Sequence, residues 1–127
     1  MARILIVEDS PTNMKLTSVL LRHAGHSVLS ASDAETGLAL ARAEHPDLVL
    51  MDIHLPGMDG LEATSILKGD PATASIPVIA LTALAMSTDQ ERTRSAGCDA
   101  YIAKPLRYQE LYVAIDGLLL RTGHPAP

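Results

Sequence analysis

Polar side chains that could take part in chemistry stand at the ends of four short apolar segments of this 127-residue chain. They are Glu8 and Asp9 after residues 4–7, Asp52 after 48–51, Thr82 after 78–81 and Lys104 after 101–103. Short apolar runs bounded by turn residues are typical of buried parallel strands. Because the carboxyl ends of parallel strands meet at one edge of a sheet, we expect these side chains to share one cleft.

The three carboxylates predict a site for a hard divalent cation, because like charges crowded into a small volume need a cation to neutralise them. Oxygen ligands without a Cys or His pattern favour Mg²⁺ (or Mn²⁺), which keeps waters and phosphate oxygens as its other ligands. Lys104 adds a compact positive charge and Thr82 a hydroxyl donor, both suited to phosphoryl oxygens. The set fits phosphoryl transfer with Asp52 as the nucleophile.

Strands and helices are predicted to alternate along the chain and to position these residues. The expected strands are residues 4–7, 27–31, 47–52, 78–81 and 101–103. The expected helices begin after Ser10, after Ser32 or Asp33, after Asp59 and at Ser87, and a fifth carries the apolar stripe Leu111, Ile115, Leu118 and Leu119. Capping residues support the helix starts, Gly25 marks the end of the first helix, and residues 68–75 read as a loop. The pattern predicts an α/β fold of five βα units around one sheet.

Length and composition are typical of one domain with a single core, expected over residues 1–121, followed by a short C-terminal tail at 122–127. The formal net charge of -5 argues against binding to nucleic acid, which requires a basic patch. The single cysteine, Cys98, allows no internal disulfide and fits a reducing, cytoplasmic compartment. No apolar stretch approaches the roughly 20 residues of a membrane span, so no membrane association is expected.

The segments around the polar residues resemble the receiver domain of two-component response regulators, the CheY-like family, over essentially the whole chain. The segments that carry the resemblance are residues 4–9, 47–60, 77–83 and 101–105. The first helix, with Asn13-Met14-Lys15-Leu16, is similar to stand-alone receivers of the DivK type and to receivers of hybrid kinases. The resemblance implies a doubly wound (βα)₅ flavodoxin-like sandwich with a five-stranded parallel sheet in the order 2-1-3-4-5.

The resemblance also implies a role for each acidic residue. Asp52 would accept a phosphoryl group from a phosphohistidine on a sensor histidine kinase or a histidine phosphotransfer protein. Asp9 and Asp52 would ligate Mg²⁺ together with the backbone carbonyl of His54, and Glu8 would act mainly through metal-bound water.

The same resemblance implies how the phosphoryl group is held and sensed. Thr82 and Lys104 would bind the aspartyl phosphate, Ala83 would leave access to it, and Lys104-Pro105 would be a cis peptide bond. Thr82 would move toward the phosphate and Tyr101 would follow inward, a local charge change that biases a two-state packing element.

That movement would reshape the surface of the fourth helix, fifth strand and fifth helix, where a downstream protein target would bind. We expect this surface to comprise Leu84 to Met86, Tyr101, Leu106, Tyr108 and Tyr112.

The expected function is a stand-alone switch that catalyses only the gain and loss of its own phosphoryl group and is otherwise no enzyme. The alternative is a receiver module of a larger hybrid kinase, or a relay that passes phosphate to a phosphotransfer histidine. A haloacid dehalogenase-type phosphatase is disfavoured, because His54 stands where that family has a second Asp. A flavin binder is disfavoured because Glu8 and Asp9 replace a Gly/Ser/Thr-rich phosphate cradle after the first strand.

Overall fold

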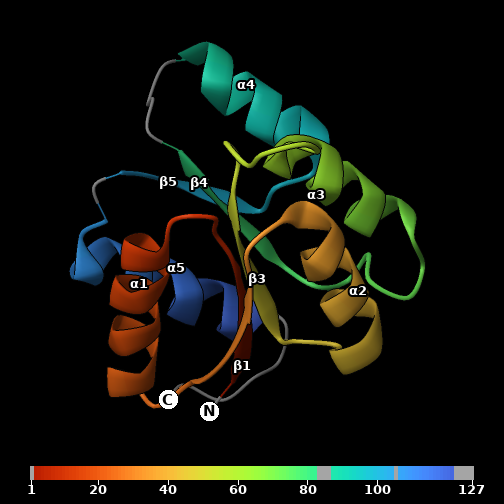
Figure 1. Cartoon of the computed structure of the whole chain (residues 1–127). Coiled ribbons are helices and arrows are strands. Elements are labelled where there is room, and N and C mark those ends of the chain that lie inside the picture. Colours follow the sequence, from red (N-terminus) through yellow and green to blue (C-terminus); the bar gives the residue numbers. More distant parts are fainter. Residues whose placement is uncertain (1, 83–86, 105, 122–127) are drawn as a thin grey trace.

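Five parallel strands and five helices alternate in the computed structural model, which describes residues 2–82, 87–104 and 106–121, with the backbone alone for 87–90 (Figure 1). The strands are β1 (Arg3–Val7), β2 (Ser27–Ala31), β3 (Leu48–Asp52), β4 (Val78–Thr82) and β5 (Ala100–Ala103). The helices are α1 (Pro11–His23), α2 (Ala34–Glu44), α3 (Gly60–Gly69), α4 (Ser87–Ala96) and α5 (Tyr108–Arg121). The sheet order is β2-β1-β3-β4-β5, and every pairing is parallel. The predicted fold class and strand order are confirmed.

Helices cover both faces of the sheet, with α1 and α5 on one face and α2, α3 and α4 on the other (Figure 1). Alternate residues of β1 divide between the two layers, as the pleat of a strand requires. Ile4 and Ile6 pack with α1 and α5, whereas Leu5 and Val7 pack with α2 and α3. The chain has no Phe or Trp, so aliphatic side chains build both layers. The central strands are buried on both faces, and only their carboxyl ends are available for polar groups.

Three helices begin with a capped turn near the carboxyl edge of the sheet. The side chains of Ser10, Asp33 and Asp59 each accept a hydrogen bond from the backbone N–H three residues later, over 3.3, 2.7 and 2.8 Å. Each cap satisfies an N–H that the helix itself leaves unpaired. For α2, the structure selects Asp33 over Ser32 as the cap. At the other end of α1, Gly25 has a φ of 93°, a left-handed conformation that explains its role as a stop.

Some boundaries differ from those predicted. The loop expected at 68–75 begins at Asp70, because Lys68 and Gly69 complete the last turn of α3. The side chain of Asp70 then accepts a hydrogen bond from the N–H of Ala72 over 2.9 Å, which shapes the turn that follows the helix. β3 starts at Leu48 rather than Asp47. The predicted capping side chain of Ser87 and the predicted tail at 122–127 lie outside the described parts of the chain.

The helices α1 and α5 are joined directly on their shared face of the sheet. The hydroxyl of Tyr112 donates to the backbone carbonyl of Leu20 over 2.8 Å, and the ring of Tyr108 lies 5.9 Å from that of Tyr112 in an edge-to-face arrangement. Leu106 packs against the core cluster on the same side. Tyr101 packs instead on the opposite face of the sheet. Leu106 and Tyr112 thus lie on the α1 side of the sheet and Tyr101 on the other side. Their membership of one partner surface stays a prediction, and Leu84 to Met86 lie outside the described residues.

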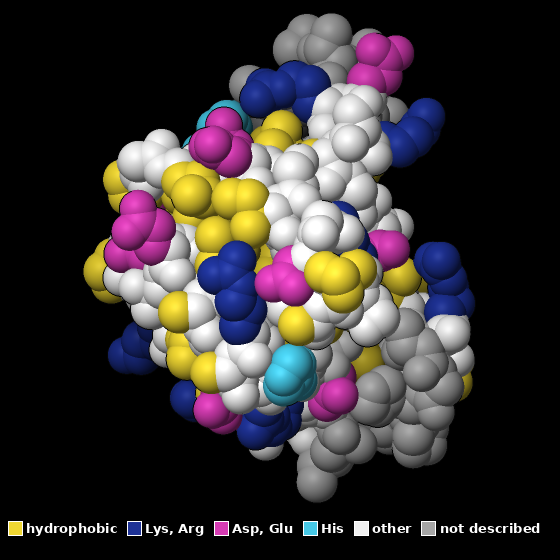
Figure 2. Space-filling view, turned by 90° about the vertical axis from the view of Figure 1, so that its right-hand side faces the viewer, with side chains coloured by type: hydrophobic (Ala, Val, Ile, Leu, Met, Phe, Trp, Pro, Cys, Tyr) yellow, Lys and Arg dark blue, Asp and Glu magenta, His cyan; other side chains and the backbone are white. Residues whose placement is uncertain are grey.

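Charged side chains are mixed on the side of the molecule where α2 and α3 lie. Lys and Arg side chains stand among acidic ones there, without a continuous basic stripe among the residues drawn in colour (Figure 2). Within the described ranges, none of the helices is long and apolar enough to cross a membrane.

Candidate functional site

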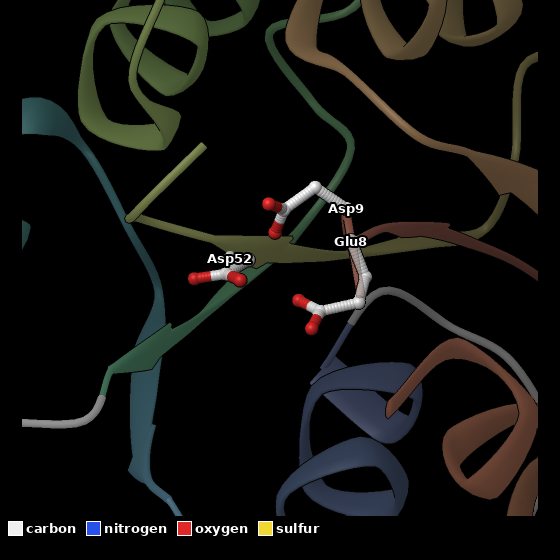
Figure 3. A group of neighbouring side chains, drawn as sticks. All are labelled: Glu8, Asp9 and Asp52. Carbon is white, nitrogen blue, oxygen red and sulfur yellow. The ribbon is translucent and has the colours of Figure 1, made fainter. Parts of the chain in front are cut away.

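The ends of β1 and β3 bring three carboxylates into one place. Glu8 and Asp9 follow β1 directly, and Asp52 is the last residue of β3. One carboxylate oxygen from each of the three residues lies within 4.8 Å of the other two. In Figure 3, Glu8 and Asp9 both turn toward Asp52. Glu8 and Asp52 are each only 3% exposed, whereas Asp9 is exposed to solvent, so the cluster has a buried floor and an open side.

Lys104 brings a positive charge to the buried part of this cluster. Its Nζ lies 3.0 Å from Oδ2 of Asp52 and 3.4 Å from Oε2 of Glu8. The backbone N–H of Lys104 donates to the carbonyl of Thr82 over 2.7 Å, which continues the β4–β5 pairing past the end of β5. The sheet therefore anchors the backbone of Lys104 while its side chain reaches across to β1 and β3.

Three further residues named from the sequence lie at the end of β4, in the turn after β3 and on β5. Thr82, the last residue of β4, is fully buried. The backbone N–H of His54 donates to Oδ1 of Asp52 over 3.0 Å, and the His54 side chain is exposed. Tyr101 is half-buried and packs against a small cluster that contains Ile53. Ala83 and Pro105, predicted for access and for a cis peptide bond, lie outside the described residues.

The two buried carboxyl groups differ in their affinity for protons. Burial, together with a hydrogen bond from its own carboxyl group to Asp52, raises the pKa of Glu8 from 4.5 to about 7, against the opposing effects of Asn13 and Lys104. Burial alone would also raise the pKa of Asp52. The hydrogen bonds from Glu8, from the N–H of His54 and from Lys104 outweigh burial and lower that pKa below 3.8. Asp52 is therefore the carboxylate that stays ionised, as a nucleophile must.

Asn13 is part of the site but was not among the candidates from the sequence. Its Nδ2 donates to Oε1 of Glu8 over 3.0 Å. Ser10 caps α1, which places Asn13 in the first helical turn, facing back toward the end of β1. The available signal was helical register, because a polar side chain one turn after a cap can reach the residues that precede the helix.

The start of α3 approaches the backbone of Asp52 closely, and only glycine fits there. A Cβ atom on Gly60 would lie 2.7 Å from the Cα of Ile53 and closer still to the carbonyl oxygen of Asp52. The N–H of Gly60 donates to the carbonyl of Ile53 over 3.1 Å. Thr64 is fully buried and donates from its hydroxyl to the carbonyl of Gly60 over 2.8 Å. The site strand and α3 are thus in backbone contact.

The donor set fits a magnesium ion. It consists of carboxylate oxygens from Glu8, Asp9 and Asp52, with no sulfur or imidazole ligand among them. One lysine cannot balance three carboxylates, so the cluster retains negative charge that a divalent cation would neutralise. Exposed Asp9 leaves room for the waters that Mg²⁺ normally keeps.

The architecture and this site match a known family. A family model described as the response regulator receiver domain matches residues 4–116. The chain belongs to this family. Receiver domains are signalling modules of two-component systems, which matches the resemblance drawn from the sequence.

Two relatives and one solved structure illustrate the relationship. The polar-differentiation response regulator DivK of Brucella ovis is 50% identical to this receiver domain over 116 residues, which cover 91% of this chain and 94% of DivK. Protein PilH of Pseudomonas aeruginosa is 48% identical over 120 residues, covering 94% and 98% of the two chains. The receiver domain of a sensor histidine kinase from Pseudomonas aeruginosa is 34% identical, with a TM-score of 0.87 over 93% of this chain and 97% of that chain. That structure holds a magnesium ion in its active-site cleft.

Proposed function

We propose that this receiver domain is a cytoplasmic switch that accepts a phosphoryl group on Asp52 in a Mg²⁺-dependent reaction. One observation carries the proposal. Asp52 is buried and ionised, and its two oxygens contact the N–H of His54 and the ammonium of Lys104. Glu8 and Asp9 stand beside it and complete an acidic cluster that could hold a cation.

The donor is a phosphohistidine on a sensor histidine kinase or a histidine phosphotransfer protein. An oxygen of Asp52 attacks the phosphorus, a new O–P bond forms, the N–P bond breaks, and the imidazole nitrogen of the donor retains the electron pair and takes up a proton. Lys104 and Thr82 stabilise the charge on the phosphoryl oxygens. Asp9, Asp52 and the carbonyl of His54 would hold Mg²⁺, which would supply charge neutralisation, and Glu8 would act mainly through water bound to the metal.

The phosphoryl group is proposed to change partner binding through α4, β5 and α5. Tyr101 and the exposed side of α5 form a shallow groove there, lined by Tyr101, Ile102, Gln109, Glu110, Val113 and Ala114. Val113 is 72% exposed and available to a partner. Thr82 and Tyr101 would couple the site to this groove. Amide NMR shifts test the coupling: phosphorylation should move signals of β5 and this side of α5, and shifts confined to the cleft would contradict it.

The phosphoryl acceptor is tested by intact mass after incubation with Mg²⁺ and acetyl phosphate. The expected result is one phosphoryl adduct in wild type that disappears in Asp52→Asn and on removal of Mg²⁺ by a chelator. Asp116→Asn, a matched change on α5, should retain the adduct. An adduct that survives Asp52→Asn would place the acceptor elsewhere and overturn the proposal.

The alternative role is a relay, either within a larger hybrid kinase or toward a separate phosphotransfer histidine. Incubation of the phosphorylated domain with a histidine phosphotransfer protein separates the two roles. A stand-alone switch should lose its phosphoryl group to water at a rate that the added protein does not change. Rapid transfer to the added histidine would identify a relay.

A further inference from the structure

Asn13 links the first turn of α1 to the acidic site. Its side-chain amide donates to Oε1 of Glu8 over 3.0 Å. Its backbone N–H donates to the Ser10 side chain over 3.3 Å, so the cap of α1 fixes the turn that carries it. Asn13 itself is exposed, whereas Glu8 is 3% exposed. A surface helix thus controls the direction of a buried carboxylate.

Glu8 has different partners for its two oxygens. Oε1 accepts from Asn13, and Oε2 lies 3.4 Å from Nζ of Lys104. Lys104 is closer to Asp52, at 3.0 Å. Without the amide of Asn13, Oε1 of Glu8 loses its hydrogen-bond donor, and the carboxylate can turn closer to the ammonium of Lys104, because a charge-assisted hydrogen bond is stronger than a neutral one. Lys104 would then be drawn away from Asp52.

We infer that Asn13 is a positioning residue for phosphoryl transfer. It holds the Glu8 carboxylate in the direction of the cation site and thereby leaves Lys104 with Asp52. The inference rests on the proposed function, since it assigns Asn13 a task in that same reaction. It predicts that loss of the amide weakens Mg²⁺ binding and slows phosphorylation even when Mg²⁺ is saturating.

Asn13 can be replaced without crowding. It lines a groove of about 370 Å³ together with Leu16, Leu106 and other residues, so a side chain of similar size has room and apolar neighbours. Asn13→Leu retains shape and removes the donor. Thr12→Leu is the matched control, because Thr12 is an exposed residue of the same turn.

The test measures the Kd for Mg²⁺ by calorimetry without phosphodonor, the rate of adduct formation at saturating Mg²⁺, and the unfolding midpoint. Partners of metal ligands typically contribute about 10- to 100-fold to affinity, and Asn13 acts one step further out. Asn13→Leu should therefore raise Kd and lower the rate by about three- to tenfold, with an unchanged midpoint, while Thr12→Leu changes none of the three.

A double-mutant cycle tests whether Asn13 affects Mg²⁺ affinity through Glu8 or through a change in the structure of the site as a whole. If Asn13 acts through Glu8, Asn13→Leu should have no further effect on the Mg²⁺ affinity of Glu8→Ala. Full additivity, or a wild-type Kd and rate in Asn13→Leu, would overturn the inference. If Asn13→Leu lowers the midpoint, Asn13→Ala removes the amide without an apolar branch and must show the same change in Kd. Failure of wild type to form any adduct would overturn the proposed function instead, while the Kd comparison still decides the role of Asn13.

Discussion

Nζ of Lys104 lies 3.0 Å from Oδ2 of Asp52, although the two residues are 52 positions apart in the chain. The side chain of Lys104 is 22% exposed and that of Asp52 is 4% exposed, so the pair is partly shielded from water. Burial alone would raise the pKa of Asp52, but the hydrogen bonds from Glu8 and the His54 N–H, together with the ion pair to Lys104, lower it. The lysine that is proposed to bind the phosphoryl group therefore also helps to keep the acceptor ionised.

Replacement of Lys104 should separate catalysis from metal binding. Lys104→Met retains length and removes the charge that stabilises the phosphoryl oxygens. Loss of one such group typically costs about 10²- to 10³-fold in rate, and we expect adduct formation from acetyl phosphate to fall by about that factor. Mg²⁺ affinity should be maintained or increased, because the carboxylates lose a competing cation. Lys15→Met, on the exposed side of α1, is the control, and an unchanged rate in Lys104→Met would contradict the assigned role.

Glu8 should make the metal-free protein less stable as pH rises. Its pKa is raised from 4.5 to about 7 on folding, so the folded state binds the proton more tightly than the unfolded state. The stabilisation from this group is fully present below pH 4.5 and is lost as pH rises toward about 7. Urea unfolding at a series of pH values, in the absence of Mg²⁺, measures how the free energy of unfolding changes with pH. Glu8→Gln has no carboxyl group to titrate, so its free energy of unfolding should lack this loss between pH 4.5 and about 7. An identical pH dependence in both proteins would contradict the raised pKa of Glu8.

The contribution of His26 to stability should have the opposite pH dependence. It is 5% exposed, and its Nδ1 accepts a hydrogen bond from the N–H of Ala2 over 3.3 Å. Burial lowers the pKa of His26 below 6.5, despite the nearby Asp116. Its neutral form therefore contributes stability that is present above pH 6.5 and is lost as pH falls below it. In His26→Gln, the free energy of unfolding, measured by urea unfolding, should fall less steeply as pH decreases below 6.5. An unchanged fall would contradict the lowered pKa of His26.

Two glycines should respond to alanine in opposite ways. Gly60→Ala forces a Cβ against the backbone of Asp52 and Ile53, and overpacking of this kind typically costs about 1–3 kcal/mol. Gly117 lies inside α5, and a Cβ there meets no atom within 4 Å. Gly117→Ala should stabilise the protein by about 0.5–1 kcal/mol, because alanine is the better helix former. Denaturant unfolding measures both. Gly60→Ala should also slow phosphorylation. Unchanged stability and rate in Gly60→Ala would mean that the backbone of α3 can move away from Asp52 and Ile53 to admit the Cβ.

The sheet and its polar edge could be predicted from the sequence because local signals agreed. Four apolar runs end in polar residues, and capping residues such as Ser10 follow at the correct distance. A parallel sheet then places Glu8, Asp52 and Lys104 together without knowledge of any side-chain contact. The distances among these residues are the detail that the sequence could not supply.

Relationships between helices were beyond the sequence patterns. The contact of Asn13 with Glu8 depends on how α1 leaves the end of β1, and the hydrogen bond from Tyr112 to Leu20 depends on how α5 is rotated about its axis. The apolar stripe of α5 identifies its buried side but does not say which flank meets α1. The sequence patterns therefore could not show that Tyr112 and Tyr101 lie on opposite faces of the sheet.

The distribution of the three tyrosines has a practical consequence for spectroscopy. The chain has no tryptophan, so its intrinsic fluorescence comes from Tyr101, Tyr108 and Tyr112 alone. Two of these form the edge-to-face pair on the α1 side, and the third packs on the opposite face of the sheet. Tyr108→Phe with Tyr112→Phe would leave Tyr101 as the sole emitter, at the cost of one hydrogen bond to α1. The protein would then report on the surroundings of its own proposed switch residue by light emission, with no attached dye.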